Sequence, residues 1–216
     1  MKLGITIMLI FFSVLLGGCQ IGKEVVPSEM HPSDLPDERA FQDEFTREFL
    51  QSVEETRPGY YPFLSKTGKY KMDFPADAVI GKQGYTLKES HFEALIGGIE
   101  GKMFAGFTLF YHGENDLENI EIHLDWFQGR IGKKLEYEVF ENDHLRMYYK
   151  HFQRGNFDKN VAYVQNLQDS GSIEIIFTVE CTTFNDCNES HVDRIQQDFL
   201  NWIKSIKFIN EYDSID

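Results

Sequence analysis

The stretch "NVAYVQNLQDSGSIEIIFTVEC" (residues 160–181) predicts two β-strands joined by a tight turn. In both halves, 160–167 and 172–181, aliphatic and aromatic residues alternate with polar ones, which is the period of a strand with a buried face. The polar segment 168–171 between them is short and ends in glycine, as hairpin turns often do. No helical crossover fits into so short a connection, so the two strands are predicted to be antiparallel.

Segments nearer the amino terminus repeat this pattern. The further predicted strands are 69–74, 103–112, 119–127, 134–141 and 144–152. In "NIEIHLDWF" (119–127), the alternation predicts that Trp126 and three aliphatic residues point inward and that the charged residues point to solvent. Residues 84–98 fit either two strands or a strand and a helical turn. Sequential hairpins of this kind predict a largely antiparallel sheet.

Two amphipathic helices are predicted to flank these strands. In 36–54, phenylalanines recur every four residues at Phe41, Phe45 and Phe49, which places them on one helical stripe. A second apolar stripe extends from 192 to 206, with lysines near its carboxyl end. We therefore expect an α+β fold: a largely antiparallel sheet of about six to eight strands, with one amino-terminal and one carboxy-terminal helix packed on it.

The amino terminus carries a targeting signal. Residues 3–16 are uncharged and apolar, which is too short for a bilayer-spanning helix and typical of a signal peptide. The following "LGGC" (16–19) resembles the lipobox of bacterial lipoproteins, which implies cleavage before Cys19 and lipidation of its thiol. The alternative is a short hydrophobic helix with an incidental cysteine. The predicted organisation is a signal peptide at 1–18, a lipidated tether at 19–35 and one α+β domain at 36–216.

Composition limits the partners and the redox state of the chain. The formal net charge of −14 argues against nucleic acid as a partner and against a domain that lies flat on anionic lipid. With Cys19 lipidated, Cys181 and Cys187 remain, and outside the cytoplasm they are predicted to form a disulfide. A metal pair or two free thiols are the alternatives, although two cysteines alone make a poor zinc site.

A second resemblance concerns the domain itself. The segments "GKYKMDFP" (68–75) and "FLNWIKSIKF" (199–208), together with the order of the elements, resemble PsbP-like domains, which are α-β-α sandwiches. That resemblance implies a largely non-enzymatic role in assembly or binding. It assigns no individual binding residue.

Motifs of catalysis are absent from the sequence, which contains neither Gly-x-Ser-x-Gly nor His-Glu-x-x-His. The best candidates for chemistry are Glu121, His123 and Asp125, which would share one face of a strand, with His112 across the hairpin. Such a carboxylate–imidazole cluster would suit a divalent metal ion or a general base. The competing interpretation is the solvent face of an amphipathic strand, where polar residues are expected in any case.

These observations favour a membrane-anchored lipoprotein outside the cytoplasm that acts as a non-catalytic binding or assembly module of the cell envelope. Its expected partners are the membrane, through the lipid anchor, and an envelope protein or small ligand; no cofactor is expected. One alternative is an envelope metal-dependent hydrolase that uses the His123 cluster. Another is an immunity or exclusion factor.

Overall fold

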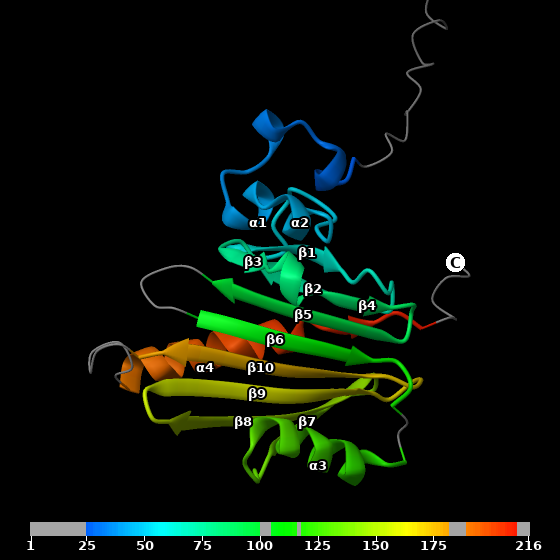
Figure 1. Cartoon of the computed structure of the whole chain (residues 1–216), viewed down its shortest axis with the longest axis vertical. Helices are drawn as coiled ribbons and strands as arrows, with labels where there is room; N and C mark the ends of the chain where they lie inside the picture. The colour runs from blue at the N-terminus through cyan, green and yellow to red at the C-terminus, as the bar shows by residue number, and fades with distance from the viewer. Residues whose placement is uncertain (1–24, 100–104, 116–117, 182–188, 211–216) are drawn as a thin grey trace, which may run out of the picture.

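The computed structural model describes residues 25–99, 105–115, 118–181 and 189–210 (Figure 1). The α-helices are α1 (Arg39–Gln42), α2 (Glu44–Arg47), α3 (Ile120–Ile131) and α4 (Glu189–Lys204), and the 3-10 helices are η1 (Pro27–Glu29), η2 (Pro32–Asp34) and η3 (Lys82–Gly84). The strands are β1 (Tyr60–Leu64), β2 (Tyr70–Pro75), β3 (Ala78–Ile80), β4 (Thr86–Lys88), β5 (Phe92–Ile99), β6 (Ala105–His112), β7 (Glu138–Glu141), β8 (Leu145–Arg154), β9 (Phe157–Asn166), β10 (Ser172–Glu180) and β11 (Lys207–Phe208).

The strands form two antiparallel sheets. The large, eight-stranded sheet has the order β3-β5-β6-β10-β9-β8-β7, with β4 paired to β5, and the small sheet has the order β1-β2-β11. Consecutive strands β8, β9 and β10 are neighbours, as the short connections between them require. The expectation of an α+β fold with a largely antiparallel sheet is confirmed.

The hairpin formed by β9 and β10 lies at the centre of the large sheet. Its register pairs Ile175 with Ala162 and Ser172 with Gln165, so the two strands are aligned along almost their whole length. Gly171 in the turn has a φ of 118°, a backbone conformation that glycine adopts without steric cost. β10 pairs with β6 on its other side, which places this hairpin in the sheet interior.

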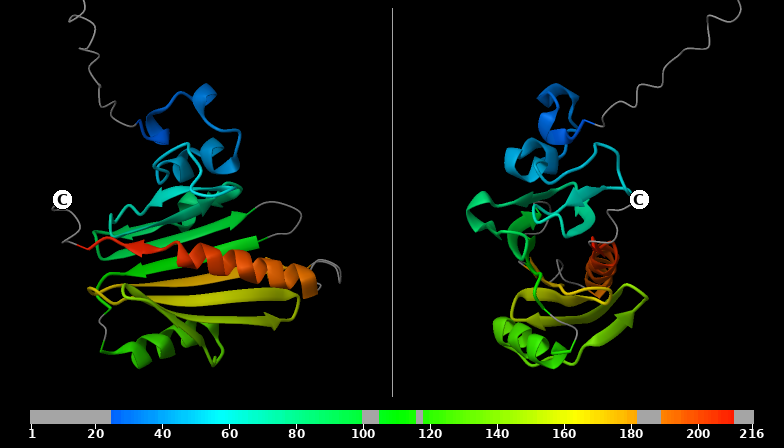
Figure 2. Two further views of the ribbon diagram at one scale, coloured as in Figure 1. Left: turned by 180° about the vertical axis from the view of Figure 1, so that it is seen from behind. Right: turned by 90° about the vertical axis from the view of Figure 1, so that its right-hand side faces the viewer.

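α4 covers one face of the large sheet and closes the main core (Figure 2). Its residues Phe199, Trp202 and Ile203 are buried against the inward side chains of β8, β9 and β10. The small sheet contributes Phe63 and Phe74 to the same core. The predicted carboxy-terminal helix therefore packs on the sheet as expected, with its apolar stripe inward.

Residues 120–127 are helical, so the prediction of a strand over 119–127 is wrong. They form most of α3, which packs against Val161 and Tyr163 on the face of the sheet opposite to α4. The inward residues Ile120, Leu124, Phe127 and Ile131 follow a spacing of three to four, which the nine-residue window hid behind an apparent alternation. Gly132, with φ 72°, ends the helix in the left-handed conformation.

Residues 36–54 do not form one continuous helix, which corrects a second expectation. Asp43 has extended dihedral angles, with φ −82° and ψ 114°, and separates α1 from α2. Its side chain accepts hydrogen bonds from the backbone N–H of Thr46 at 2.7 Å and from the Thr46 hydroxyl at 2.6 Å. An N-cap aspartate thus starts a new helix where the phenylalanine spacing indicated continuity. Phe41 and Phe49 are nevertheless fully buried.

The segment predicted as a tether has local structure where it is described. η1 and η2 lie within it, and Pro27 is buried. The predicted signal peptide and Cys19 lie outside the described residues. Among the helices in the described part of the chain, none is long and apolar enough to cross a bilayer.

Candidate functional site

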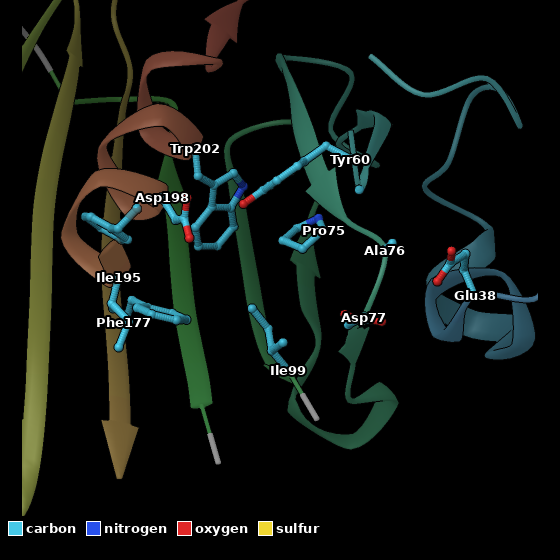
Figure 3. Close-up of a pocket in the computed structure, with 12 residues that line it drawn as sticks. Glu38, Tyr60, Pro75, Ala76, Asp77, Ile99, Phe177, Ile195, Asp198 and Trp202 are labelled. Atoms are coloured by element: carbon cyan, nitrogen blue, oxygen red, sulfur yellow. The ribbon is translucent and has the colours of Figure 1, made fainter. Parts of the chain in front are cut away.

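A cleft opens between the small sheet and α4 and encloses about 410 Å³ (Figure 3). This volume lies in the range of small-ligand sites in proteins. Its lining comes from α4, from β10, from the end of β5 and from the turns that flank β1 and β2. The lining residues are Glu38, Gly59, Tyr60, Pro75, Ala76, Asp77, Ile99, Phe177, Ile195, Asp198, Phe199 and Trp202.

Hydrogen bonds hold α4 against β2 at the base of this cleft. The indole Nε1 of Trp202 donates to the backbone oxygen of Asp73 at 2.8 Å, and the Asp73 N–H donates to the Ser205 hydroxyl at 3.0 Å. The Ser205 hydroxyl in turn donates to the backbone oxygen of Trp202 at 2.6 Å. These three hydrogen bonds fix the helix end relative to the strand.

Aromatic side chains form one wall of the cleft. Phe177 of β10 stacks on Phe199 of α4 with ring centroids 5.9 Å apart, and Phe199 meets Trp202 edge-on at 6.1 Å. Tyr60 faces Trp202 from the small sheet (Figure 3). The Arg57 guanidinium lies 3.2 Å from the centroid of the Tyr60 ring. This contact fixes Tyr60 in place, and burial raises the pKa of its hydroxyl.

Three carboxylates stand at the rim of the cleft. They are Glu38 before α1, Asp77 between β2 and β3, and Asp198 on α4. Asp77 and Asp198 are exposed, and none of the three forms an ion pair within the described residues. Apolar walls with a negative rim suit a ligand that combines an apolar body with a positive charge.

The four residues that the sequence singled out do not form the expected cluster. On a helix, residues four apart share a face while those two apart point in nearly opposite directions. Glu121 and Asp125 are accordingly exposed on the outside of α3, whereas His123 is buried beneath it. His112, at the end of β6, lies on the same buried side as His123.

Beneath α3, His112 lies close to Glu174 and Arg130 rather than to Glu121 and Asp125. Arg130 Nε lies 2.8 Å from Glu174 Oε2, and His112 Nε2 lies 3.6 Å from Glu174 Oε1. Burial lowers the pKa of His112 to about 4, and electrostatic interactions with Arg130 and His123 add to this effect. Burial also raises the pKa of Glu174, although Arg130 acts in the opposite direction. The geometry describes a buried ionic group rather than an open reaction centre.

The described residues contain no group of three or more His, Cys, Asp or Glu side chains that could hold a metal ion. The proposed ligand set of His112, Glu121, His123 and Asp125 is divided between the two sides of α3. A metal-dependent hydrolase that uses this set is therefore not supported by the geometry. The physical reason is the helical, not extended, backbone of residues 120–131.

Another polar cluster, on the α4 face of the large sheet, has no signal in the sequence. His151 Nε2 lies 2.7 Å from Asp158 Oδ2, and Asn160 Nδ2 donates to Asp158 Oδ1 at 3.3 Å. The hydroxyl of Tyr149 donates to Asn160 Oδ1 at 2.7 Å. The β8–β9 register alone places these side chains together, so no sequence spacing could have indicated them. No hydroxyl or thiol side chain hydrogen-bonds His151 within the described residues.

Cys181 directly follows β10 and is partly buried, and its N–H donates to the backbone oxygen of Asn156 at 2.8 Å. Cys187 lies outside the described residues. The disulfide between Cys181 and Cys187 stays a prediction.

The fold and the cleft define a class: an α+β protein on a large antiparallel sheet, with an aromatic, acid-rimmed cleft beside its carboxy-terminal helix. The chain belongs to the family described as "Putative lipoprotein YvcA", whose model matches residues 36–207. A Bacillus subtilis (strain 168) protein of the same description is 28% identical over 233 residues, a match that covers 94% of this chain and 96% of that protein. The expected bacterial lipoprotein family is thereby confirmed.

A crystal structure from Bacteroides thetaiotaomicron matches 70% of this chain at 11% sequence identity with a TM-score of 0.40. The match spans about half of that protein's chain, 49%. A likeness this distant carries no argument about function. The resemblance to PsbP-like domains is not tested by these matches and stays a prediction.

Proposed function

We propose that this chain is a lipid-anchored binding module on the outer side of the cell membrane, and that its ligand occupies the cleft between the small sheet and α4. The cleft carries this proposal, because it joins an aromatic wall to three carboxylates without ion-pair partners in the described structure. Membership of a lipoprotein family supports the location. The proposal assigns no catalytic step and no cofactor.

The chemistry of the lining selects the kind of ligand. Tyr60 is half-buried and offers a ring on which an aliphatic or aromatic group can pack, and Phe199 and Trp202, each 3% exposed, form the wall behind it. Asp77 and Asp198 would attract a positive charge beside that group. The ligand that fits is a segment of an envelope protein that presents an apolar side chain next to a lysine or arginine.

Site-specific photocrosslinking in intact cells tests this proposal. A benzophenone amino acid at position 77 places the reactive group on the cleft rim, and the same group at position 125 on α3 is the matched control. Asp77 and Asp125 are both exposed aspartates, so the substitutions are comparable. We expect a discrete adduct from position 77 and none from position 125.

A second variant ties the adduct to the chemistry of the cleft. Asp198→Asn should reduce the yield of the position 77 adduct several-fold, because one rim charge is lost. Equal adduct yields from positions 77 and 125, or no adduct from position 77, would show that the cleft is not the binding site.

The anchor has its own test, because binding and attachment are separate properties. Cys19→Ala should prevent lipidation and move the protein out of the membrane fraction, since stable attachment needs the acyl chains. Metabolic labelling with a palmitate analogue reports the lipid directly. A Cys19→Ala protein that still carries the label would refute the proposed anchor and leave the cleft proposal untouched.

A further inference from the structure

A cavity of about 510 Å³ lies at the opposite end of the α4–β2 contact from the acid-rimmed cleft, between β11, the carboxyl end of α4 and the β7–β8 turn. Its lining residues are Lys71, Asn142, His144, Leu145, Asn166, Gln168, Lys204, Ile206, Lys207 and Phe208. Three of them are lysines, and no aspartate or glutamate among the described residues lines the cavity. This composition is unusual in a chain with 35 acidic and 21 basic residues.

Two of these lysines form a like-charge pair. Lys71 of β2 and Lys207 of β11 are direct partners in the antiparallel register. Directly opposed side chains have Cβ atoms about 5 Å apart, and like charges there destabilise the pair of strands. Both lysines are exposed, and neither has an ion-pair partner within the described residues. The small sheet therefore keeps an electrostatic cost that a single Glu in place of either lysine would remove.

Lys204 adds a third positive charge for a different reason. It lies in the last turn of α4, where the helix dipole favours a cation, and its Nζ lies 5.3 Å from the centroid of the Phe140 ring. The helix dipole thus explains why a positive charge at Lys204 is favourable without a ligand. It does not account for Lys71 and Lys207, whose mutual repulsion remains.

Uncharged hydrogen-bonding groups complete the lining. Asn166 is held by hydrogen bonds from its Nδ2 to Asn210 Oδ1 at 2.9 Å and to the Ser170 backbone oxygen at 3.4 Å. The Gln168 side-chain oxygen accepts from Asn210 Nδ2 at 3.0 Å, which leaves the Gln168 amide nitrogen as a donor. These bonds fix the amides before any ligand arrives.

We propose that this cavity binds a multiply charged oxyanion, a phosphate group in particular, between Lys71, Lys204 and Lys207. Such a group offsets the Lys71–Lys207 repulsion and accepts hydrogen bonds from ammonium groups and from the Gln168 amide. The volume has room for a phosphorylated small molecule beyond the phosphate itself. This site is separate from the acid-rimmed cleft, so it does not depend on the function proposed above.

Isothermal titration of the full chain in detergent with inorganic pyrophosphate tests the site. We expect saturable binding with one site per chain, weakened as salt concentration rises. Lys71→Gln should lower the affinity at least tenfold. Lys134→Gln is the matched control, since it removes the same charge from an exposed position that does not line this cavity. The control should change the affinity less than twofold.

Thermal stability without ligand separates a binding role from a structural one. Lys71→Glu should raise the midpoint Tm of the free protein by about 1–3 °C, because an opposite-charge pair replaces a repulsive one. The same variant should abolish pyrophosphate binding. A lowered Tm in this variant would show that the lysine holds the fold, and would overturn the proposal.

Two further titrations identify the source of the phosphate. Dihexanoyl phosphatidylglycerol below its micelle concentration presents a lipid headgroup, and glycerol 3-phosphate presents a free metabolite-like phosphate. Tighter binding of the first assigns the site to a lipid, and tighter binding of the second to a free phosphate. A variant that ends at Asn210 lacks residues 211–216, which include three acidic side chains. If this variant bound pyrophosphate more than tenfold more tightly than the full chain, the chain's own tail would be the occupant of the cavity, and the proposal would be overturned. Absence of saturable binding of every probe would overturn it as well.

Discussion

The two faces of the large sheet are built from different chemistry. The face under α4 joins the small sheet in one extensive apolar core that is rich in phenylalanine and tyrosine. Among the described residues, the face under α3 has a smaller cluster of five buried apolar residues, with Glu174, His123 and the partly exposed His112 beside it. The first face therefore provides most of the hydrophobic stabilisation. Both faces also bury ionisable groups with shifted pKa values: burial raises the pKa of Glu93 on the first face, and on the second it lowers the pKa of His112 and raises that of Glu174. Hydrophobic stability should consequently depend mainly on the α4 face, whereas destabilisation by acid should depend on His112 under α3, because the raised pKa of a carboxyl group acts in the opposite direction.

Truncation of a large core side chain on each face gives the largest expected effect. Phe199→Ala removes a ring that contacts Phe177, Tyr149 and Trp202, and should lower the free energy of unfolding by about 3–5 kcal/mol. Phe127→Ala, beneath α3, should cost less, because the smaller cluster around it can collapse further into the cavity. Urea denaturation of both variants measures the difference. An equal or larger loss for Phe127→Ala would contradict the comparison of the two faces.

Destabilisation by acid should act through His112 on the α3 face. The pKa of His112 is lowered from 6.5 to about 4 in the folded state, chiefly by burial and also by Arg130 and His123. A base with a lowered pKa contributes stability that is complete above pH 6.5 and is lost as pH falls through about 4. Between pH 7 and pH 4, the native chain should therefore lose about 3 kcal/mol through this residue.

The variant His112→Asn isolates this contribution, because asparagine does not titrate. Its free energy of unfolding should fall less between pH 7 and pH 4 than that of the native chain. Glu174, whose raised pKa acts in the opposite direction, is present in both proteins and cancels in the difference. His144→Asn, at an exposed turn, is the control and should keep the native pH dependence. A native pH dependence in His112→Asn would assign the response elsewhere.

The sequence predicted the α4 face well and the α3 face poorly, for identifiable reasons. Residues 160–181 fit only an antiparallel hairpin, because the short glycine-containing turn and the strict alternation of apolar residues both predict it. In 119–127, alternation and helical spacing coincide over nine residues, and the helical spacing becomes distinct only when the stripe is extended beyond Phe127 to Ile131. Asp43 broke the amino-terminal helix by capping, which the phenylalanine spacing cannot show. The acid-rimmed cleft joins residues from 38 to 202, a juxtaposition that no local pattern contains.

The ion pair between Arg130 and Glu174 offers a smaller test of the α3 face. Arg130→Met leaves a buried carboxylate without its 2.8 Å partner and should destabilise the fold by about 1–2 kcal/mol. This value is well below that of a fully buried pair, because the Arg130 side chain is 41% exposed. Adding Glu174→Gln should recover most of the loss, since the unpaired charge is then removed. A double variant no more stable than Arg130→Met would show that charge burial is not the cause.

The smallest expected effect concerns Trp126, where the helical and extended interpretations of residues 119–127 differ most. Alternation along a strand would place this ring in the core, and its loss would then cost about 3–5 kcal/mol. On α3 the side chain is 62% exposed, so Trp126→Gln should change the free energy of unfolding by less than about 0.5 kcal/mol. Leu124→Gln is the matched control, because Leu124 packs inward from the same helix and should cost considerably more. Urea denaturation ranks the two variants. A larger loss for Trp126→Gln than for Leu124→Gln would restore the extended interpretation and remove α3 as the cover of this face.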